Sequence, residues 1–213
     1  MIASGPHANQ PVLVSGPPED EATSAAILVH GRGASARDIL TLAGELRQPE
    51  LAYLAPQAAG STWYPQSFLA PIELNEPELS SGLSVLAGLV DRLAAGGIPA
   101  ERILLVGFSQ GACLTLEFVA RNAQRYGGVA GLTGGLIGPP GAPRDFEGSL
   151  AGTPMFLGSG DPDPHVPWEC VLESAGVFRK LAAEVELRRY PGMAHTISAD
   201  EIESVSALAS RLL

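Results

Sequence analysis

Ser109 is the residue whose type and surroundings point most directly to chemistry. It lies in a Gly-x-Ser-x-Gly pattern at 107–111, between an apolar run at 103–106 and an apolar stretch at 112–120. Between a strand and a helix, this pattern makes a turn too tight for bulky residues two positions from the serine, and it raises the hydroxyl above the sheet. A serine hydroxyl becomes a nucleophile when a base removes its proton. The alternative is an ordinary glycine-rich turn.

A histidine later in the chain would be the base that such a serine needs. The sequence has four histidines. We expect His7 to lie in a frayed N-terminus, His30 to end an early strand and His165 to lie in a turn. His195 follows the last apolar run and precedes the last amphipathic stretch. In hydrolases whose serine lies on a turn between a strand and a helix, the base occupies this position in the chain. The alternative for His195 is a histidine on a surface loop.

An acidic residue between the serine and the histidine would orient the imidazole and stabilise its cation. Two aspartates compete for this role, Asp161 and Asp163, and both follow the apolar run at 154–157. Their positions alone do not separate them. One is expected to orient the histidine, and the other to form a turn by bonding to nearby backbone.

The elements that must position these residues alternate along the chain. Short apolar runs predict strands at 26–29, 51–54, 102–106, 128–132, 154–157 and 185–190, with a possible edge strand at 11–14. Apolar residues spaced by three and four predict helices at 83–93 and 202–212. Ser35 and Ser198 are expected to cap helices. Strands without polar alternation between helices indicate a mostly parallel sheet covered on both faces.

Composition limits the class of protein. The 213 residues are 46% hydrophobic, which suits one compact domain over 1–213 and excludes general disorder. The net charge of −10 argues against nucleic-acid binding. Cys113 and Cys170 are too few for a disulfide framework or a metal cluster, and no metal or organic cofactor is expected. No membrane-spanning run and no secretory signal are visible, so we expect a cytoplasmic protein without stable membrane insertion.

The chain resembles the phospholipase/carboxylesterase family of α/β-hydrolases, which includes the acyl-protein thioesterases. The matching segments span most of the sequence: Leu28-Val29-His30-Gly31-Arg32-Gly33, Gly97-Ile98-Pro99 with Arg102-Ile103, Gly107-Phe108-Ser109-Gln110-Gly111, Asp163-Pro164-His165-Val166-Pro167 and Tyr190-Pro191-Gly192-Met193-Ala194-His195. The resemblance implies an α/β-hydrolase fold, with a mostly parallel central sheet, helices on both faces and no large cap domain.

The resemblance also implies the catalytic residues. Family members carry the catalytic aspartate in an Asp-Pro-x-Val-Pro segment, which maps to Asp163. With Ser109 and His195 it would complete a catalytic triad. The backbone N–H of Gln110, the residue after the nucleophile, is expected to donate to the oxyanion. By resemblance, the second donor is the backbone N–H of Arg32.

Three side chains near this site have open roles. At the position of Arg32, the thioesterases usually have an apolar residue. The Arg32 side chain is expected either to bind a substrate carboxylate or to pair with a surface acid. Trp63 lies in the irregular stretch at 56–77 and either walls the substrate pocket or pins the loop to the core. Cys113 is interpreted as a small buried residue rather than a nucleophile of the kind that dienelactone hydrolases use.

The function indicated is hydrolysis of carboxylic esters with small or medium acyl chains through an acyl-enzyme, with the ester and water as partners. A thioesterase or lysophospholipase of the same family is one alternative, and a non-catalytic hydrolase-like ligand-binding protein is another. Acidic residues cluster at 48–91 and 147–178, which are expected to border the pocket. We therefore expect uncharged esters to be favoured, and salt to improve turnover of an anionic ester more than that of a neutral one.

Overall fold

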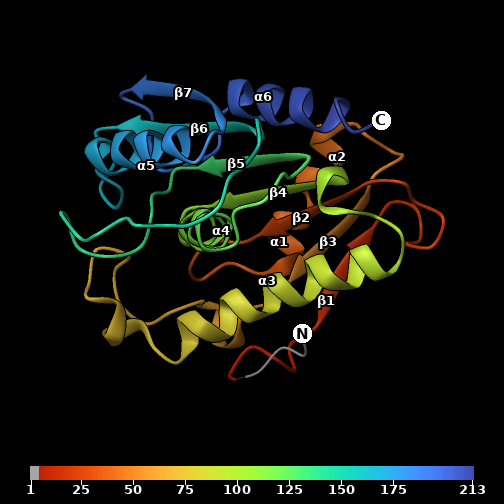
Figure 1. Cartoon of the computed structure of the whole chain (residues 1–213), viewed down its shortest axis with the longest axis horizontal. Coiled ribbons are helices and arrows are strands. Elements are labelled where there is room, and N and C mark those ends of the chain that lie inside the picture. Colours follow the sequence, from red (N-terminus) through yellow and green to blue (C-terminus); the bar gives the residue numbers. More distant parts are fainter. Residues whose placement is uncertain (1–4) are drawn as a thin grey trace.

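A seven-stranded sheet forms the centre of the molecule (Figure 1). The computed structural model describes residues 5–213. The strand order is β1-β3-β2-β4-β5-β6-β7; β1 runs antiparallel to β3, and the other neighbouring pairs are parallel. The strands are β1 (Val12–Ser15), β2 (Ala25–Val29), β3 (Ala52–Pro56), β4 (Ile103–Phe108), β5 (Gly128–Leu132), β6 (Pro154–Asp161) and β7 (Glu184–Pro191). The predicted mostly parallel sheet is confirmed.

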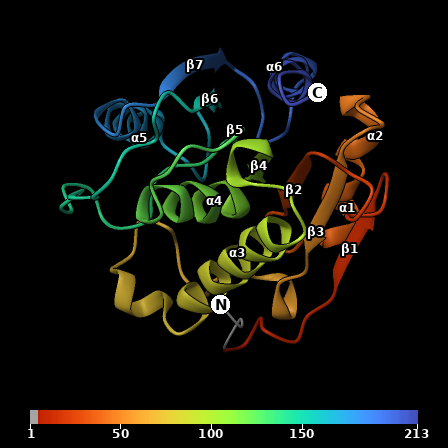
Figure 2. The ribbon, with the colours of Figure 1, turned by 45° about the vertical axis from the view of Figure 1, so that its right-hand side comes forward.

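Helices cover both faces of this sheet (Figure 2). The helices are α1 (Ala36–Leu40), α2 (Leu42–Leu46), α3 (Glu78–Ala95), α4 (Gln110–Arg121), α5 (Trp168–Lys180) and α6 (Ala199–Ser210). One apolar core lies between the sheet and α3, α4 and α5, and a second lies between the sheet and α1, α2 and α6. The doubly covered sheet that the apolar runs predicted is therefore present.

Local sequence explains where these elements begin. The side chain of Ser198 accepts from the backbone of Glu201, and the Glu201 carboxylate accepts from the backbone of Ser198, so a capping box starts α6. Ser35 and Asp38 make the same reciprocal pair at α1. The strands β2, β3 and β5 are buried at every position, as continuous apolar runs require in a sheet covered on both faces.

The carboxyl ends of the parallel strands bring the chemistry-bearing segments to one edge of the sheet. Ser109 follows β4, which lies between β2 and β5, while β6 ends at Asp161 and β7 ends at Pro191. In open α/β sheets, ligands bind outside this edge. The loop between β3 and α3 contains two short 3-10 helices, Ala59–Ser61 and Ile72–Asn75.

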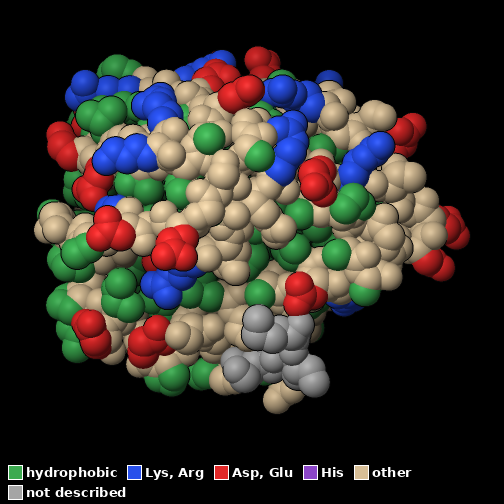
Figure 3. Space-filling view, viewed as in Figure 1, with side chains coloured by type: hydrophobic (Ala, Val, Ile, Leu, Met, Phe, Trp, Pro, Cys, Tyr) green, Lys and Arg blue, Asp and Glu red, His purple; other side chains and the backbone are tan. Residues whose placement is uncertain are grey.

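The surface charge is not gathered in one patch on the face that Figure 3 shows. Acidic side chains are spread over this face, while most of the basic ones lie over its upper part, above α5, β7 and α6 (Figure 3). None of the helices described over residues 5–213 is both long enough and apolar enough to cross a lipid bilayer.

Candidate active site

Ser109 lies in a strained turn between β4 and α4. Its backbone has φ 55° and ψ −119°, a conformation that non-glycine residues rarely adopt. The turn is held on both sides, because the Ser109 N–H donates to Leu132 O at 2.9 Å and the Cys113 N–H donates to Ser109 O at 3.0 Å. The turn that the Gly-x-Ser-x-Gly pattern predicts is therefore present.

The two glycines of the pattern are required by close backbone contacts. A Cβ on Gly107 would lie 2.3 Å from Gly111 O, and a Cβ on Gly111 would lie 2.2 Å from Val29 O and 2.5 Å from His30 O. These are backbone atoms of adjacent elements, so no side-chain rotation relieves the overlap. The glycines let α4 start directly against β2, and this fixes the position of Ser109.

We therefore expect Gly111→Ala to destabilise the protein by about 3 kcal/mol or more, because the added methyl overpacks a backbone junction. Gly176→Ala is the matched control, since Gly176 lies inside α5 and a Cβ there meets no atom within 4 Å. That change should stabilise the helix by up to about 1 kcal/mol. Urea unfolding of both variants measures the difference, and equal stabilities would contradict the packing argument.

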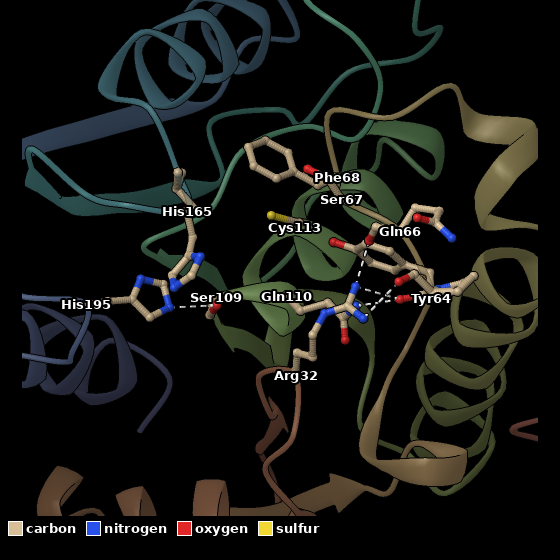
Figure 4. Close-up of a pocket in the computed structure, with 12 residues that line it drawn as sticks. Arg32, Tyr64, Gln66, Ser67, Phe68, Ser109, Gln110, Cys113, His165 and His195 are labelled. Atoms are coloured by element: carbon tan, nitrogen blue, oxygen red, sulfur yellow. Dashed lines mark hydrogen bonds between the residues drawn. The ribbon is translucent and has the colours of Figure 1, made fainter.

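His195 is placed directly beside the serine hydroxyl. Its Nε2 lies 2.8 Å from Ser109 Oγ (Figure 4). Its Nδ1 lies 2.8 Å from Asp163 Oδ2. The imidazole contacts the rings of Phe108 and His165, whose centroids lie 5.2 and 4.9 Å from its own. Hydrogen bonds at both nitrogens and contacts with two other rings therefore restrain the imidazole.

Asp163 is the aspartate that reaches the histidine. Its Oδ1 accepts from the N–H groups of His165 at 2.8 Å and Val166 at 2.9 Å, which leaves Oδ2 for the imidazole. Burial alone would raise the pKa of Asp163, but the hydrogen bonds from His165, His195 and Val166 outweigh it and lower the pKa below its ordinary value. Asp161 instead forms an ion pair with Arg189.

His7 and His30 lie away from the cavity in structural environments, and the expectation that His7 belongs to a frayed N-terminus is wrong. His7 is 2% exposed: its Nδ1 accepts from the Ala59 N–H at 3.0 Å and its Nε2 lies 3.0 Å from Trp63 O. His30 is also buried, and its Nε2 accepts from the Ala58 N–H at 3.1 Å. Burial lowers the pKa of His30. The N-terminal segment from residue 5 onward is thus tied to the loop after β3.

Trp63 pins that loop and does not line the substrate cavity. Its indole is fully buried and donates from Nε1 to His30 O at 2.8 Å. The Gln110 side chain also holds the loop through two hydrogen bonds. Its Oε1 accepts from the backbone N–H of Trp63 at 2.9 Å, and its Nε2 donates to Tyr64 O at 2.8 Å. The assignment of Trp63 to the pocket wall is therefore corrected: the indole turns into the core to satisfy its N–H.

A cavity of about 430 Å³ opens beside Ser109 and His195 (Figure 4). Its lining residues come from the loops after β2, β3, β6 and β7, from the turn before α4 and from α4 itself: Arg32, Tyr64, Pro65, Gln66, Ser67, Phe68, Ser109, Gln110, Cys113, His165, Val166 and His195. No Asp or Glu is among these lining residues. Glu76, one of the acids expected near the mouth, instead accepts from the backbone and side chain of Ser80.

The side chain of Arg32 departs from the simpler expectation of a surface ion pair. Its guanidinium donates to three backbone oxygens, those of Tyr64 at 2.8 Å, Pro65 at 3.0 Å and Gln66 at 2.6 Å. The backbone beside it approaches the serine, since a Cβ on Gly31 would lie 3.3 Å from Ser109 Cβ. The Arg32 side chain therefore lines the cavity. Its main chain comes directly after Gly31, the residue whose backbone approaches Ser109.

Cys113 lines the floor of the same cavity but is a poor nucleophile. It is 1% exposed, and its Sγ accepts from the Gly135 N–H at 3.5 Å. Burial raises the pKa of the thiol to about 12, so almost none of it is thiolate at neutral pH. The interpretation of Cys113 as a small buried residue agrees with this environment.

Over residues 5–213, no three His, Cys, Asp or Glu side chains are grouped to hold a metal ion.

No sequence pattern marks five of the residues that line the cavity: Tyr64, Gln66, Ser67, Phe68 and Val166. The available signals are the irregular stretch at 56–77 and the turn after the apolar run at 154–157, both of which are expected near the site. Which side chains turn inward depends on long-range contacts such as that of Gln110 with Tyr64.

Comparison with known proteins places the chain in a family. A crystal structure of a phospholipase/carboxylesterase from Dyadobacter fermentans superposes with a TM-score of 0.91 and 45% identity, covering 96% of this chain and 98% of that one. The crystal structure of the Bacillus cereus carboxylesterase, at 18% identity, TM-score 0.75 and coverage of 97% and 96%, shares the fold.

Among curated sequences, acyl-protein thioesterase 1 of Kluyveromyces lactis is 30% identical over 138 residues, which are 63% of this chain and 60% of that protein. The match to the same protein of Debaryomyces hansenii, at 35% identity over 106 residues, spans 49% of this chain and 46% of the relative. The chain thus matches about half of the length of these relatives. The phospholipase/carboxylesterase family matches residues 10–212, and the chain belongs to this family.

Proposed function

We propose that the protein is a serine hydrolase that cleaves carboxylic esters of small or medium acyl chain through an acyl-enzyme. The observation that carries this proposal is the continuous hydrogen-bonded chain from Ser109 Oγ through His195 to Asp163, with both links at 2.8 Å. A serine, a histidine and an aspartate in this order and at these distances have the geometry of nucleophile, base and orienting acid.

The proton path follows from the same contacts. His195 Nε2 accepts the proton of Ser109 as Oγ attacks the ester carbonyl. Asp163 Oδ2 holds the proton of His195 Nδ1, which leaves Nε2 free to accept and stabilises the imidazolium that forms. The lowered pKa of Asp163 supports this role, because the group stays ionised at the pH where a base is needed.

Two backbone N–H groups are proposed to bind the oxyanion of the tetrahedral intermediate. Gln110 is the first residue of α4, so its N–H has no acceptor within the helix. Arg32 follows Gly31, whose backbone lies against Ser109. Donors held ready for a developing negative charge contribute about 10²–10³ in rate each.

Both halves of the reaction use the same groups. The imidazolium returns its proton to the leaving alkoxide, which departs as the alcohol and leaves Ser109 acylated. Water then attacks the acyl carbonyl while His195 accepts its proton. The acid departs as Ser109 Oγ recovers a proton, and the enzyme is restored.

A thioesterase activity is the second candidate, and it rests on one observation: the curated relatives at 30% and 35% identity are acyl-protein thioesterases.

The size of the cavity favours the first candidate. Its volume of about 430 Å³ lies at the smaller end of the usual range for small-molecule sites, which favours short and medium acyl chains.

A fluorophosphonate probe and a substrate panel test the proposal. We expect the wild-type protein to be labelled, and p-nitrophenyl esters of two to eight acyl carbons to be hydrolysed faster than long-chain acyl thioesters. Preference for long acyl thioesters would favour the second candidate. Resistance to the probe together with no turnover of any ester would instead indicate a hydrolase-like ligand-binding protein.

A further inference from the structure

The Arg32 guanidinium is the feature of the cavity that ester hydrolysis alone does not explain. Among the residues that line the cavity, Arg32 is the one Arg or Lys, and no Asp or Glu accompanies it. Its contacts with the backbone oxygens of Tyr64, Pro65 and Gln66 use three of its five N–H donors, so two remain for a ligand. Figure 4 shows the group facing Tyr64 on the side of the cavity away from His195.

This positive charge has no acidic partner among residues 5–213. The ion pairs of the described chain leave Arg32 out, and its three acceptors are neutral carbonyls. The negative charge within the site, Asp163, has a side chain with 0% exposure and is satisfied by His165, Val166 and His195. A bound anion would therefore meet the uncompensated charge of Arg32 while the aspartate is shielded.

Residues other than Arg32 also hold the loop in place. The Tyr64 carbonyl already accepts from Gln110 Nε2 at 2.8 Å, and the Gln66 N–H donates to Asn75 Oδ1 at 2.8 Å. Asn75 also donates from Nδ2 to Ser67 O at 3.0 Å. These bonds anchor both sides of the loop. The guanidinium, held in place by three carbonyls, can therefore act as a preorganised donor that loses little rotamer freedom when a ligand binds to it.

We propose that Arg32 makes the enzyme selective for esters that carry a second, ionised carboxylate. The proposal rests on the proposed esterase function and names its substrate class. It runs against the preference for uncharged esters that the acidic stretches of the sequence predict, because those acids do not line the cavity.

Paired substrates that are matched in size and differ in charge test the inference. On the acyl side, the mono-p-nitrophenyl ester of glutaric acid is compared with its primary amide counterpart. On the alcohol side, p-acetoxybenzoate is compared with p-acetoxybenzamide. We expect kcat/KM to favour the carboxylate by on the order of tenfold in at least one pair. The pair that shows the effect identifies which half of the ester faces Arg32.

Arg32→Met should reduce that ratio to about one, and Arg32→Lys should retain part of it. The ratio within one variant cancels any loss that both substrates share, including a disturbed oxyanion site or a displaced loop. Arg37→Met is the charge-matched control, because Arg37 is an exposed residue of α1, and it should leave the ratio unchanged.

Salt provides an independent reading. Raising the ionic strength should lower kcat/KM for the anionic ester relative to the neutral one, since screening weakens attraction to the charge of Arg32, an exposed residue. Equal kcat/KM for both members of both pairs, or a ratio that survives Arg32→Met, would overturn the inference while leaving the esterase proposal intact. Loss of the esterase proposal would appear differently, as no turnover of either member by the wild-type enzyme.

Discussion

Replacement of Ser109 by alanine is expected to lower kcat/KM for p-nitrophenyl esters by on the order of 10⁵. The change removes the oxygen that lies 2.8 Å from His195 Nε2 and leaves the imidazole with no proton to take from a nucleophile. Alanine keeps the same backbone, and the turn is held by the bonds to Leu132 and Cys113, so the fold should persist. Steady-state kinetics with an unchanged unfolding midpoint would establish that the loss is chemical.

Ser67→Ala is the matched control for this experiment. Ser67 is another serine that lines the cavity, and its hydroxyl accepts a 3.2 Å hydrogen bond from the Leu69 N–H. We expect it to remain active and to be labelled by a fluorophosphonate as the wild type is. Equal labelling of Ser109→Ala would contradict the proposed nucleophile, and equal hydrolysis by that variant would contradict the acyl-enzyme mechanism.

The strands and the serine turn could be predicted because their signals are local. Buried parallel strands require continuous apolar runs, and the run at 128–132 coincides with β5. The glycines at 107 and 111 are dictated by contacts within one strand–turn–helix unit and against the adjoining β2. By contrast, the spacing of apolar residues predicts no helix at α5. Its buried positions include Ser174 and Ala175, which weaken the apolar stripe that identifies a helix.

The pocket could be predicted only in part, because its walls depend on contacts between distant segments. The ring of His7 bonds across 56 residues to Trp63, and the Trp63 indole bonds across 33 residues to His30. No spacing pattern encodes such pairs, so the sequence alone places His7 in a frayed terminus and leaves Trp63 open between the pocket wall and the core. The same holds for Arg32, whose acceptors are backbone carbonyls more than 30 residues away.

Asp163→Asn is expected to lower kcat by about 10³–10⁴ while Asp161→Asn has little effect on activity. In the Asp163→Asn variant, Oδ1 can still accept from the N–H groups of His165 and Val166, so the turn is preserved. Its amide nitrogen then donates toward His195 Nδ1, which places the imidazole proton on Nε2. An Nε2 that carries a proton cannot accept the proton of Ser109, so the base is lost although its position is kept.

The Asp161→Asn control separates the two aspartates that local sequence leaves equivalent. It breaks the ion pair with Arg189, whose side chain is 56% exposed, and should cost no more than about 1 kcal/mol of stability. Similar losses of kcat in both variants would contradict the assignment of Asp163 as the orienting acid.

The lowered pKa of Asp163 gives this pair of variants a second measurement. A carboxyl whose folded pKa lies below its unfolded value, here ordinarily 3.8, stabilises the fold at all pH values above the unfolded value. That contribution disappears as the pH falls through the folded pKa. The difference in unfolding free energy between wild type and Asp163→Asn should therefore stay constant near neutrality and narrow below about pH 4. A difference that does not change with acid would show that the carboxylate is not held ionised by His195 and the two N–H groups, and would remove the electrostatic basis of its proposed role.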